Sequence, residues 1–138
     1  MCDAQNNSVD GIFHLRHTAV VAWEVRFTHE FEVWWDSLSE NEQEEISAKV
    51  DLLEERGPML SRPHADVIVS SRHANMKELR GKVDERQLRV LFAFDLNRAA
   101  LLLIGGDKTD NPKWYEEFVP IADDLFDEHL REVEKERS

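Results

Sequence analysis

Residues 75–107 read NMKELRGKVDERQLRVLFAFDLNRAALLLIGGD, and this stretch decides the fold. Within it, every second residue from Leu88 to Phe94 is large and apolar. This period of two predicts a strand over residues 87–95, with one face in the core and the other face outside it. Residues 99–104 form a nearly continuous apolar run instead, which predicts a central strand that is buried on both faces.

The segments next to these two strands extend the same sheet. Residues 75–83 alternate in part and predict a further strand before residue 87. The polar links at residues 84–86 and 96–98 have the length of antiparallel hairpin turns. The pair Gly105-Gly106 is expected to end the last strand or to form a bulge in it.

The sequence before this stretch predicts a strand and two helices. Residues 22–28 alternate like a half-buried strand, and residues 29–37 then change to the apolar spacing of an amphipathic helix. Ser39 and Glu42 have the spacing of a capping box, which starts a second helix that the glycine at residue 57 ends. Because the link between them is short, the two helices are expected to form a hairpin.

The remaining elements are a short strand and a long helix. Val67 and Val69 suggest the strand, and residues 112–136 carry a helical apolar stripe. Pro120 is expected to kink this helix or to divide it in two. Taken in order, these elements predict a small α+β domain. Its antiparallel or mixed sheet has four to five strands, with the N-terminal helical hairpin and the C-terminal helix on one side.

Length and composition indicate one globular domain. The chain has 138 residues, of which 41% are hydrophobic and 33% are charged. That is enough to bury one core and is unlike the composition of a disordered chain. We expect residues 21–138 to form the domain and residues 1–20 to be a flexible leader. The sequence shows neither an apolar run of 18 residues nor a secretion signal, and its single cysteine, Cys2, excludes an internal disulfide. We therefore expect a cytoplasmic protein without a membrane span.

Charge is unevenly distributed along the chain. The formal net charge is −12, which disfavours a general nucleic-acid binder. Residues 56–98, however, hold 9 basic and 5 acidic side chains, whereas residues 1–55 hold 3 basic and 13 acidic ones. Residues 99–138 are again acidic, with 5 basic and 11 acidic side chains. The basic middle of the chain can therefore form a local anion site.

A group of cations is expected on one face of the sheet. If Leu88 and its alternate neighbours face the core, Arg89 lies on the opposite face, which it can share with Arg80 and Lys82. Lys108 follows the next strand. Clustered cations repel one another, and a sheet tolerates this cost when an anion is bound there, such as an RNA phosphate. An alternative is that the arginines form structural ion pairs, Arg80 with Glu78 or Asp84, and Arg89 with Glu85 or Asp95.

Tyr115 and His73 are further candidates for chemistry. Tyr115 can act as an acid or a base or stack on a nucleobase, although helix packing is the alternative. Its neighbour Trp114 is expected in the core. His73 lies near the basic middle, where a histidine can shuttle a proton or simply lie at the surface. No ligand spacing for a metal and no glycine-rich nucleotide motif is present, so neither a metal nor a cofactor is expected.

Several motifs together resemble the RelE/HigB toxin superfamily of type II toxin–antitoxin modules, and more narrowly its phage-derived HigB-like branch. They are KELR at residues 77–80, RVLFAFD at residues 89–95, LLLIGGDK at residues 101–108 and WY at residues 114–115. The likeness extends over about residues 21–130. Each motif alone is weak, and their order is what carries the resemblance.

The resemblance implies a RelE-like fold and a ribosome-dependent mRNA endonuclease that a helix-turn-helix antitoxin holds inactive. Operator DNA would be contacted through the antitoxin alone. The catalytic positions of the family correspond here to Arg80, Arg89, Lys108 and Tyr115. We expect the RNA-binding residues around them to be Lys77, Lys82, His73 and Lys113. This chain departs from many members in its negative net charge and in having one basic residue, not two or more, after the last strand.

Two other readings stay open at this point. The chain can be a catalytically inactive RelE-like module that pairs with the antitoxin and modulates transcription, or an unrelated anion-binding domain.

Overall fold

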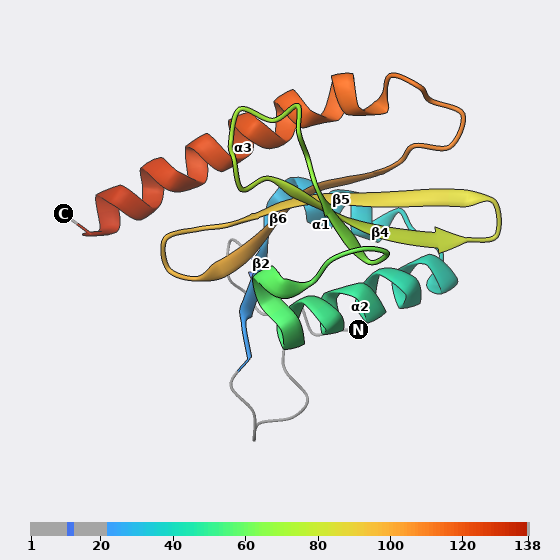
Figure 1. The fold of residues 1–138 in the computed structure, drawn as a ribbon, viewed down its shortest axis with the longest axis horizontal. Coiled ribbons are helices and arrows are strands. Elements are labelled where there is room, and N and C mark those ends of the chain that lie inside the picture. Colours follow the sequence, from blue (N-terminus) through green and yellow to red (C-terminus); the bar gives the residue numbers. More distant parts are fainter. Residues whose placement is uncertain (1–10, 13–21, 138) are drawn as a thin grey trace.

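A mixed β-sheet lies at the centre of the molecule, with helix α3 (Trp114–Arg137) along one face and helix α2 (Glu40–Arg56) along the other (Figure 1). The computed structural model describes residues 11–12 and 22–137. In spatial order the strands are β1 (Gly11–Ile12), β2 (Glu24–Phe27), β6 (Ala99–Asp107), β5 (Arg86–Phe94), β4 (Lys77–Val83) and β3 (Ala65–Val67). β2 runs parallel to β6, and the other neighbouring pairs are antiparallel. The predicted α+β class and mixed sheet are confirmed.

The first strand lies in the segment that we expect to be a leader. β1 has two residues, which pair with Phe27 and Arg26 of β2. Together with it the sheet has six strands, one more than the four to five that the pattern predicts. The other residues of segment 1–20 lie outside the described residues, so the flexible leader stays a prediction.

The two helices predicted before the basic middle of the chain are both present. Helix α1 (His29–Asp36) begins at Thr28, whose hydroxyl accepts the Phe31 N–H at 3.0 Å. Helix α2 begins at Ser39 with the predicted capping box, in which the Ser39 hydroxyl accepts the Glu42 N–H and the Glu42 carboxylate accepts the Ser39 N–H. Such a cap contributes about 1 kcal/mol. A short 3₁₀ turn, η2 (Gly57–Met59), follows α2 directly.

The helices cover both faces of the sheet, which corrects the expectation that they lie on one side. The core under α1 and α2 includes Leu88, Val90 and Leu102, whereas the core under α3 includes Leu91 and Leu103. The apolar run of β6 explains this arrangement, because successive side chains of a strand point to opposite faces. A strand that is apolar on both faces needs a cover on both.

Gly105 and Gly106 lie inside β6 and do not end it, contrary to expectation. A Cβ atom on Gly105 would lie 2.3 Å from the Trp34 ring, and one on Gly106 would lie 2.5 Å from Nε1 of Trp114. The two glycines therefore admit one tryptophan ring on each face of the sheet, and the close approach excludes larger residues.

Two element boundaries also differ from the sequence-based expectation. β3 ends at Val67, and Val69 lies outside it with 93% of its surface exposed. Helix α3 runs unbroken past Pro120, which neither divides it nor ends it. Pro120 and Glu116, one turn earlier, are both exposed, so water can reach the Glu116 carbonyl that the proline ring leaves without an N–H donor. Among the described residues, no helix is both long and apolar enough to cross a membrane.

Candidate functional site

The predicted cations gather on the hairpin of β4 and β5 and just after the end of β6, and these three strands are neighbours in the sheet (Figure 1). Arg80 of β4 lies directly opposite Arg89 of β5, and Lys82 lies opposite Gln87. Lys108 lies next to Gln87 on the other side of β5, because its N–H donates to the Gln87 carbonyl at 3.0 Å. The alternation of side chains puts Arg80, Lys82, Arg89 and Lys108 on the face that α3 covers in part. We call these four residues the cationic face.

A buried carboxylate lies within the cationic face. Glu78, 4% exposed, precedes Arg80 by two residues and therefore points to the same face of β4. Its Oε2 lies 3.5 Å from Nε of Arg80, and its Oε1 lies 3.4 Å from Nε of Arg89. The predicted pairing of Arg80 with Glu78 is thus present. Arg89 shares the same carboxylate in place of Glu85 or Asp95.

Arg89 is held rigidly in this arrangement. Its side chain is 7% exposed, and Nη1 donates to the Leu88 carbonyl at 2.9 Å. Its Nε is buried without a hydrogen bond in the described part of the chain, because the contact with Glu78 is an ion pair without hydrogen-bond geometry. Two arginines directly opposite each other repel, and the shared carboxylate offsets that repulsion.

Tyr115 joins the same cluster from the first turn of α3. Its hydroxyl donates to Oε1 of Glu78 at 2.7 Å, and Nζ of Lys108 lies 5.6 Å from the centre of its ring. Burial, and then the hydrogen bond to Glu78, raise the pKa of the Tyr115 phenol, which therefore keeps its proton at neutral pH. Trp114, 1% exposed, packs in the core as predicted. The structure thus brings Arg80, Arg89, Lys108 and Tyr115 together.

The four residues expected to bind RNA do not lie together. Lys82 belongs to the cationic face, and Lys113 is exposed just before α3. Lys77 lies on the opposite face of β4, where its Nζ donates to the Pro58 carbonyl at 3.1 Å. The cause is the period of two, which places Lys77 with Leu79 and apart from Arg80.

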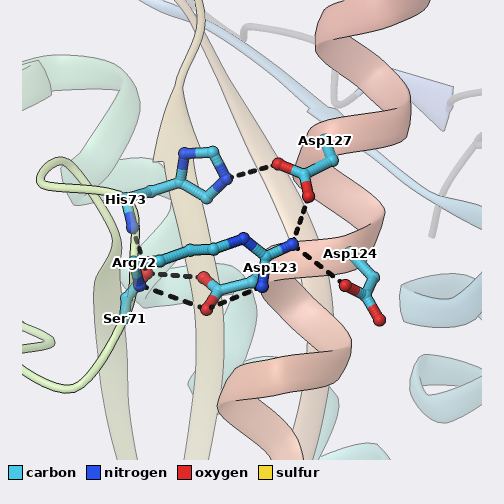
Figure 2. Close-up of polar contacts among 6 residues, drawn as sticks. All are labelled: Ser71, Arg72, His73, Asp123, Asp124 and Asp127. Atoms are coloured by element: carbon cyan, nitrogen blue, oxygen red, sulfur yellow. Dashed lines mark hydrogen bonds and ion pairs between the residues drawn. The ribbon is translucent and has the colours of Figure 1, made fainter.

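His73 lies in the loop between β3 and β4, where it is tied to α3 and not to the cationic face (Figure 2). Its Nε2 is 2.7 Å from Oδ1 of Asp127, and its ring makes an edge contact with Phe126. Arg72 pairs with the same Asp127. Hydrogen bonds from Arg72 and then His73 lower the pKa of the Asp127 carboxyl, which stays ionised at neutral pH.

Asp123 anchors the same loop more deeply. Its side chain is 6% exposed and accepts hydrogen bonds from the Ser71 hydroxyl at 2.5 Å and from the Arg72 N–H at 3.2 Å (Figure 2). Nη2 of Arg72 also reaches Asp124 at 3.0 Å. These contacts fix α3 against the sheet, and α3 carries Tyr115. The loop therefore supports the site from a distance.

Sequence reasoning missed Glu78 as a member of the site and did not consider Gln87. The signal was present in the alternation, which puts both residues on the face of Arg80 and Arg89. No group of three or more His, Cys, Asp and Glu side chains in residues 22–137 is placed to hold a metal ion.

These features define a class of protein, a small α+β domain with a cationic face around a buried carboxylate. The family described as phage-derived protein Gp49-like (DUF891) matches residues 33–127, and the chain belongs to this family. It is a family of HigB/RelE-like toxins, so the resemblance noted in the sequence is confirmed.

Two curated relatives come from Mycobacterium tuberculosis. The chain is 42% identical over 103 residues to a protein named "Putative toxin HigB2", a match that covers 73% of this chain and 51% of that protein. It is 45% identical over 93 residues to a protein named "Putative toxin HigB3", and this match covers 67% of this chain and 80% of that protein. The chain thus spans about half the length of the first relative. No solved structure matches, so the RelE-like fold stays a prediction.

Proposed function

We propose that this protein is the toxin of a type II toxin–antitoxin module and that it cleaves mRNA on the ribosome. The observation that carries the proposal is the opposed pair Arg80 and Arg89, held around Glu78 and covered by Tyr115. The names of the two relatives support the toxin role.

The cationic face suits the scissile phosphate. In cleavage through the ribose 2′-hydroxyl, the 2′-oxygen attacks phosphorus, the bond to the 5′-oxygen breaks, and a 2′,3′-cyclic phosphate forms. Negative charge grows on the phosphate oxygens in the transition state. Arg80 and Arg89 bind those oxygens with planar, charge-assisted donors, and Lys108 adds a third cation. Fixed donors of this kind are worth about 3–4 kcal/mol each in the barrier.

The hydrogen bond between Tyr115 and Glu78 offers a route for the proton. The 2′-hydroxyl gives its proton to the Tyr115 oxygen while the phenol passes its own proton to the Glu78 carboxylate. The phenol is unchanged after this relay, which suits a group whose pKa is raised. The leaving 5′-oxygen takes a proton from water, and the hydroxide that remains takes up the proton that Glu78 received.

The acidic balance of the chain predicts a slow, unsteered encounter with RNA. A formal net charge of −12 repels bulk RNA, so long-range attraction to free mRNA is weak. We place the protein in the cytoplasm, with a helix-turn-helix antitoxin as its partner and with operator DNA contacted through that antitoxin.

The test is expression of three forms from a tight inducible promoter, followed by mapping of mRNA 5′ ends within minutes. The wild type is expected to create new ends in translated frames and to stop growth. Arg80→Ala should abolish both effects. The Arg80 side chain is 29% exposed, so its loss does not open the core. Lys77→Ala is the matched control, since it removes a cation from the opposite face of the same strand, and should cleave like the wild type. Full activity of Arg80→Ala would refute the assignment of the cationic face as the site of cleavage.

The second candidate is an inactive module that binds an antitoxin and modulates transcription. The buried Glu78 favours it, because this carboxylate already neutralises part of the charge that a phosphate would meet. A soluble wild type that leaves mRNA intact but co-purifies with a helix-turn-helix protein would support this candidate over the nuclease.

A further inference from the structure

Lys108 is held between two side chains that bond to each other. The Thr109 hydroxyl donates to Oδ1 of Asp107 at 2.5 Å, and the Thr109 N–H donates to the same oxygen at 2.9 Å. The hydroxyl also accepts the Gln87 N–H at 2.8 Å, and the Gln87 carbonyl accepts the Lys108 N–H. The backbone is therefore fixed before, at and after Lys108, which defines where this lysine leaves the sheet.

Arg86 holds Asp107 from the face of the sheet opposite to the cationic face. Its Nε donates to Oδ2 of Asp107 at 2.8 Å, and its Nη1 lies 2.5 Å from Oε2 of Glu42 in the first turn of α2. Burial disfavours the Asp107 carboxylate, but hydrogen bonds from Thr109 and then from Arg86 outweigh burial and lower the pKa of this carboxyl. Asp107 is therefore ionised at neutral pH and is tied to α2 through Arg86.

These contacts leave the charge of Lys108 free, although an aspartate precedes it in the chain. Both oxygens of Asp107 are occupied, Oδ1 by Thr109 and Oδ2 by Arg86. In the described part of the chain Lys108 forms no ion pair, and its Nζ lies over the Tyr115 ring. The arrangement thus supplies a cation that has a fixed backbone and no internal counter-ion.

We propose that Thr109, Asp107 and Arg86 form a clamp that holds Lys108 against the scissile phosphate, and that Thr109 and Arg86 are positioning residues of the cleavage reaction. This inference rests on the proposed function. A cation that is already in place stabilises the charge of the transition state without the cost of ordering it during the reaction. Arg86 contributes from the other face of the sheet, through Asp107.

The experiment measures single-turnover cleavage of one defined mRNA on purified ribosomes. Thr109→Val keeps the shape of the side chain and removes the hydroxyl. A misplacement of about 1 Å can cost about 100-fold in rate, so we expect Thr109→Val to cleave at least ~10-fold more slowly than the wild type. Thr109→Ser keeps the hydroxyl and should cleave at a rate close to that of the wild type. Arg86→Gln leaves Asp107 without its counter-ion and should slow cleavage as Thr109→Val does.

A double-mutant cycle shows whether the clamp acts through Lys108. When Lys108 is replaced by Ala, the clamp has no cation left to position. Thr109→Val should then slow Lys108→Ala further by less than about 2-fold. A residue that only supports the fold would slow both backgrounds equally.

Thr28→Val is the matched control for stability. The Thr28 hydroxyl also makes two hydrogen bonds, since it accepts the Phe31 N–H at 3.0 Å and donates to the Leu103 carbonyl at 2.6 Å. Thr28 lies at the start of α1, away from the end of β6. Thr28→Val should lose stability in urea much as Thr109→Val does, but should cleave like the wild type.

Three results would overturn the clamp and leave the nuclease standing. They are a wild-type rate for both Thr109→Val and Arg86→Gln, an equal slowing with and without Lys108, and a Thr28→Val variant as slow as Thr109→Val. If circular dichroism shows that Thr109→Val does not fold, the same cycle with Arg86→Gln decides. If the wild type leaves the mRNA intact, the proposed function fails and the inference fails with it.

Discussion

Replacing Glu78 by Gln tests the reasoning about the site most severely, because it removes the charge and keeps the shape. Glu78 lies 3.4 Å from Arg89 and 3.5 Å from Arg80. At an effective dielectric constant of about 20, each such pair is attracted by about 5 kcal/mol before the cost of desolvation. That cost cancels much of the gain, and removing one member of a buried pair costs about 3–5 kcal/mol net. Because Arg80 is partly exposed, we expect the lower end of this range, about 3 kcal/mol.

The assay is urea denaturation at neutral pH, with thermal unfolding beside it. For a chain of this size, a loss of about 3 kcal/mol lowers the Tm by about 10 °C. Glu85→Gln is the matched control, because Glu85 is an exposed glutamate in the β4–β5 turn. It should change the free energy of unfolding by less than about 0.5 kcal/mol.

Glu78 has two proposed roles, as the counter-ion of the two arginines and as the proton acceptor. Stability in the presence of inorganic phosphate tests the first role, and the rate of cleavage tests the second. Without the internal carboxylate, Arg80 and Arg89 are open to an external anion, so millimolar phosphate should raise the Tm of Glu78→Gln more than that of the wild type. The same variant should cleave mRNA more slowly, since the proton acceptor is lost. Wild-type stability of Glu78→Gln, or an identical response of both proteins to phosphate, would refute the internal counter-ion.

Three further substitutions test other parts of the structure, each by urea denaturation. Gly106→Ala puts a methyl group 2.5 Å from Nε1 of Trp114 and should cost about 1–3 kcal/mol. Gly81→Ala should cost less, because its methyl group would lie 3.1 Å from Cγ of Glu45; equal costs would contradict the packing. Asp95→Asn should cost about 1–3 kcal/mol at pH 7. Burial disfavours the Asp95 carboxylate, but its hydrogen bonds outweigh that and lower its pKa below 3.8. Its stabilisation is therefore present above pH 3.8 and is lost as the pH falls through the lowered pKa, so a penalty that does not shrink as the pH is lowered would argue against an ionised Asp95. Asp123→Asn weakens the anchor of the β3–β4 loop and should speed amide exchange at residues 71–73; unchanged exchange would show that the loop is held otherwise.

The site could be predicted where it depends on local alternation. The period of two places Arg80, Lys82 and Arg89 on one face, and the short hairpin links make their strands neighbours. The same rule applied to Lys77 would have placed it on the opposite face, where the structure has it.

The remaining features depend on contacts that no local pattern encodes. Whether Arg89 pairs with Glu78 or with Glu85 depends on the register between β4 and β5, which alternation does not define. The loop that carries His73 has no period, so its attachment to Asp127 could not be predicted.

The central claim is tested most directly with purified components. Wild-type protein is mixed with ribosomes that translate one defined mRNA, and the ends of the fragments are identified. We expect cleavage only when ribosomes are present, with a 2′,3′-cyclic phosphate on the upstream fragment and a 5′-hydroxyl on the downstream one. An intact mRNA, or fragments that end in a 3′-hydroxyl and a 5′-phosphate, would contradict the proposed chemistry of Arg80, Arg89, Tyr115 and Glu78.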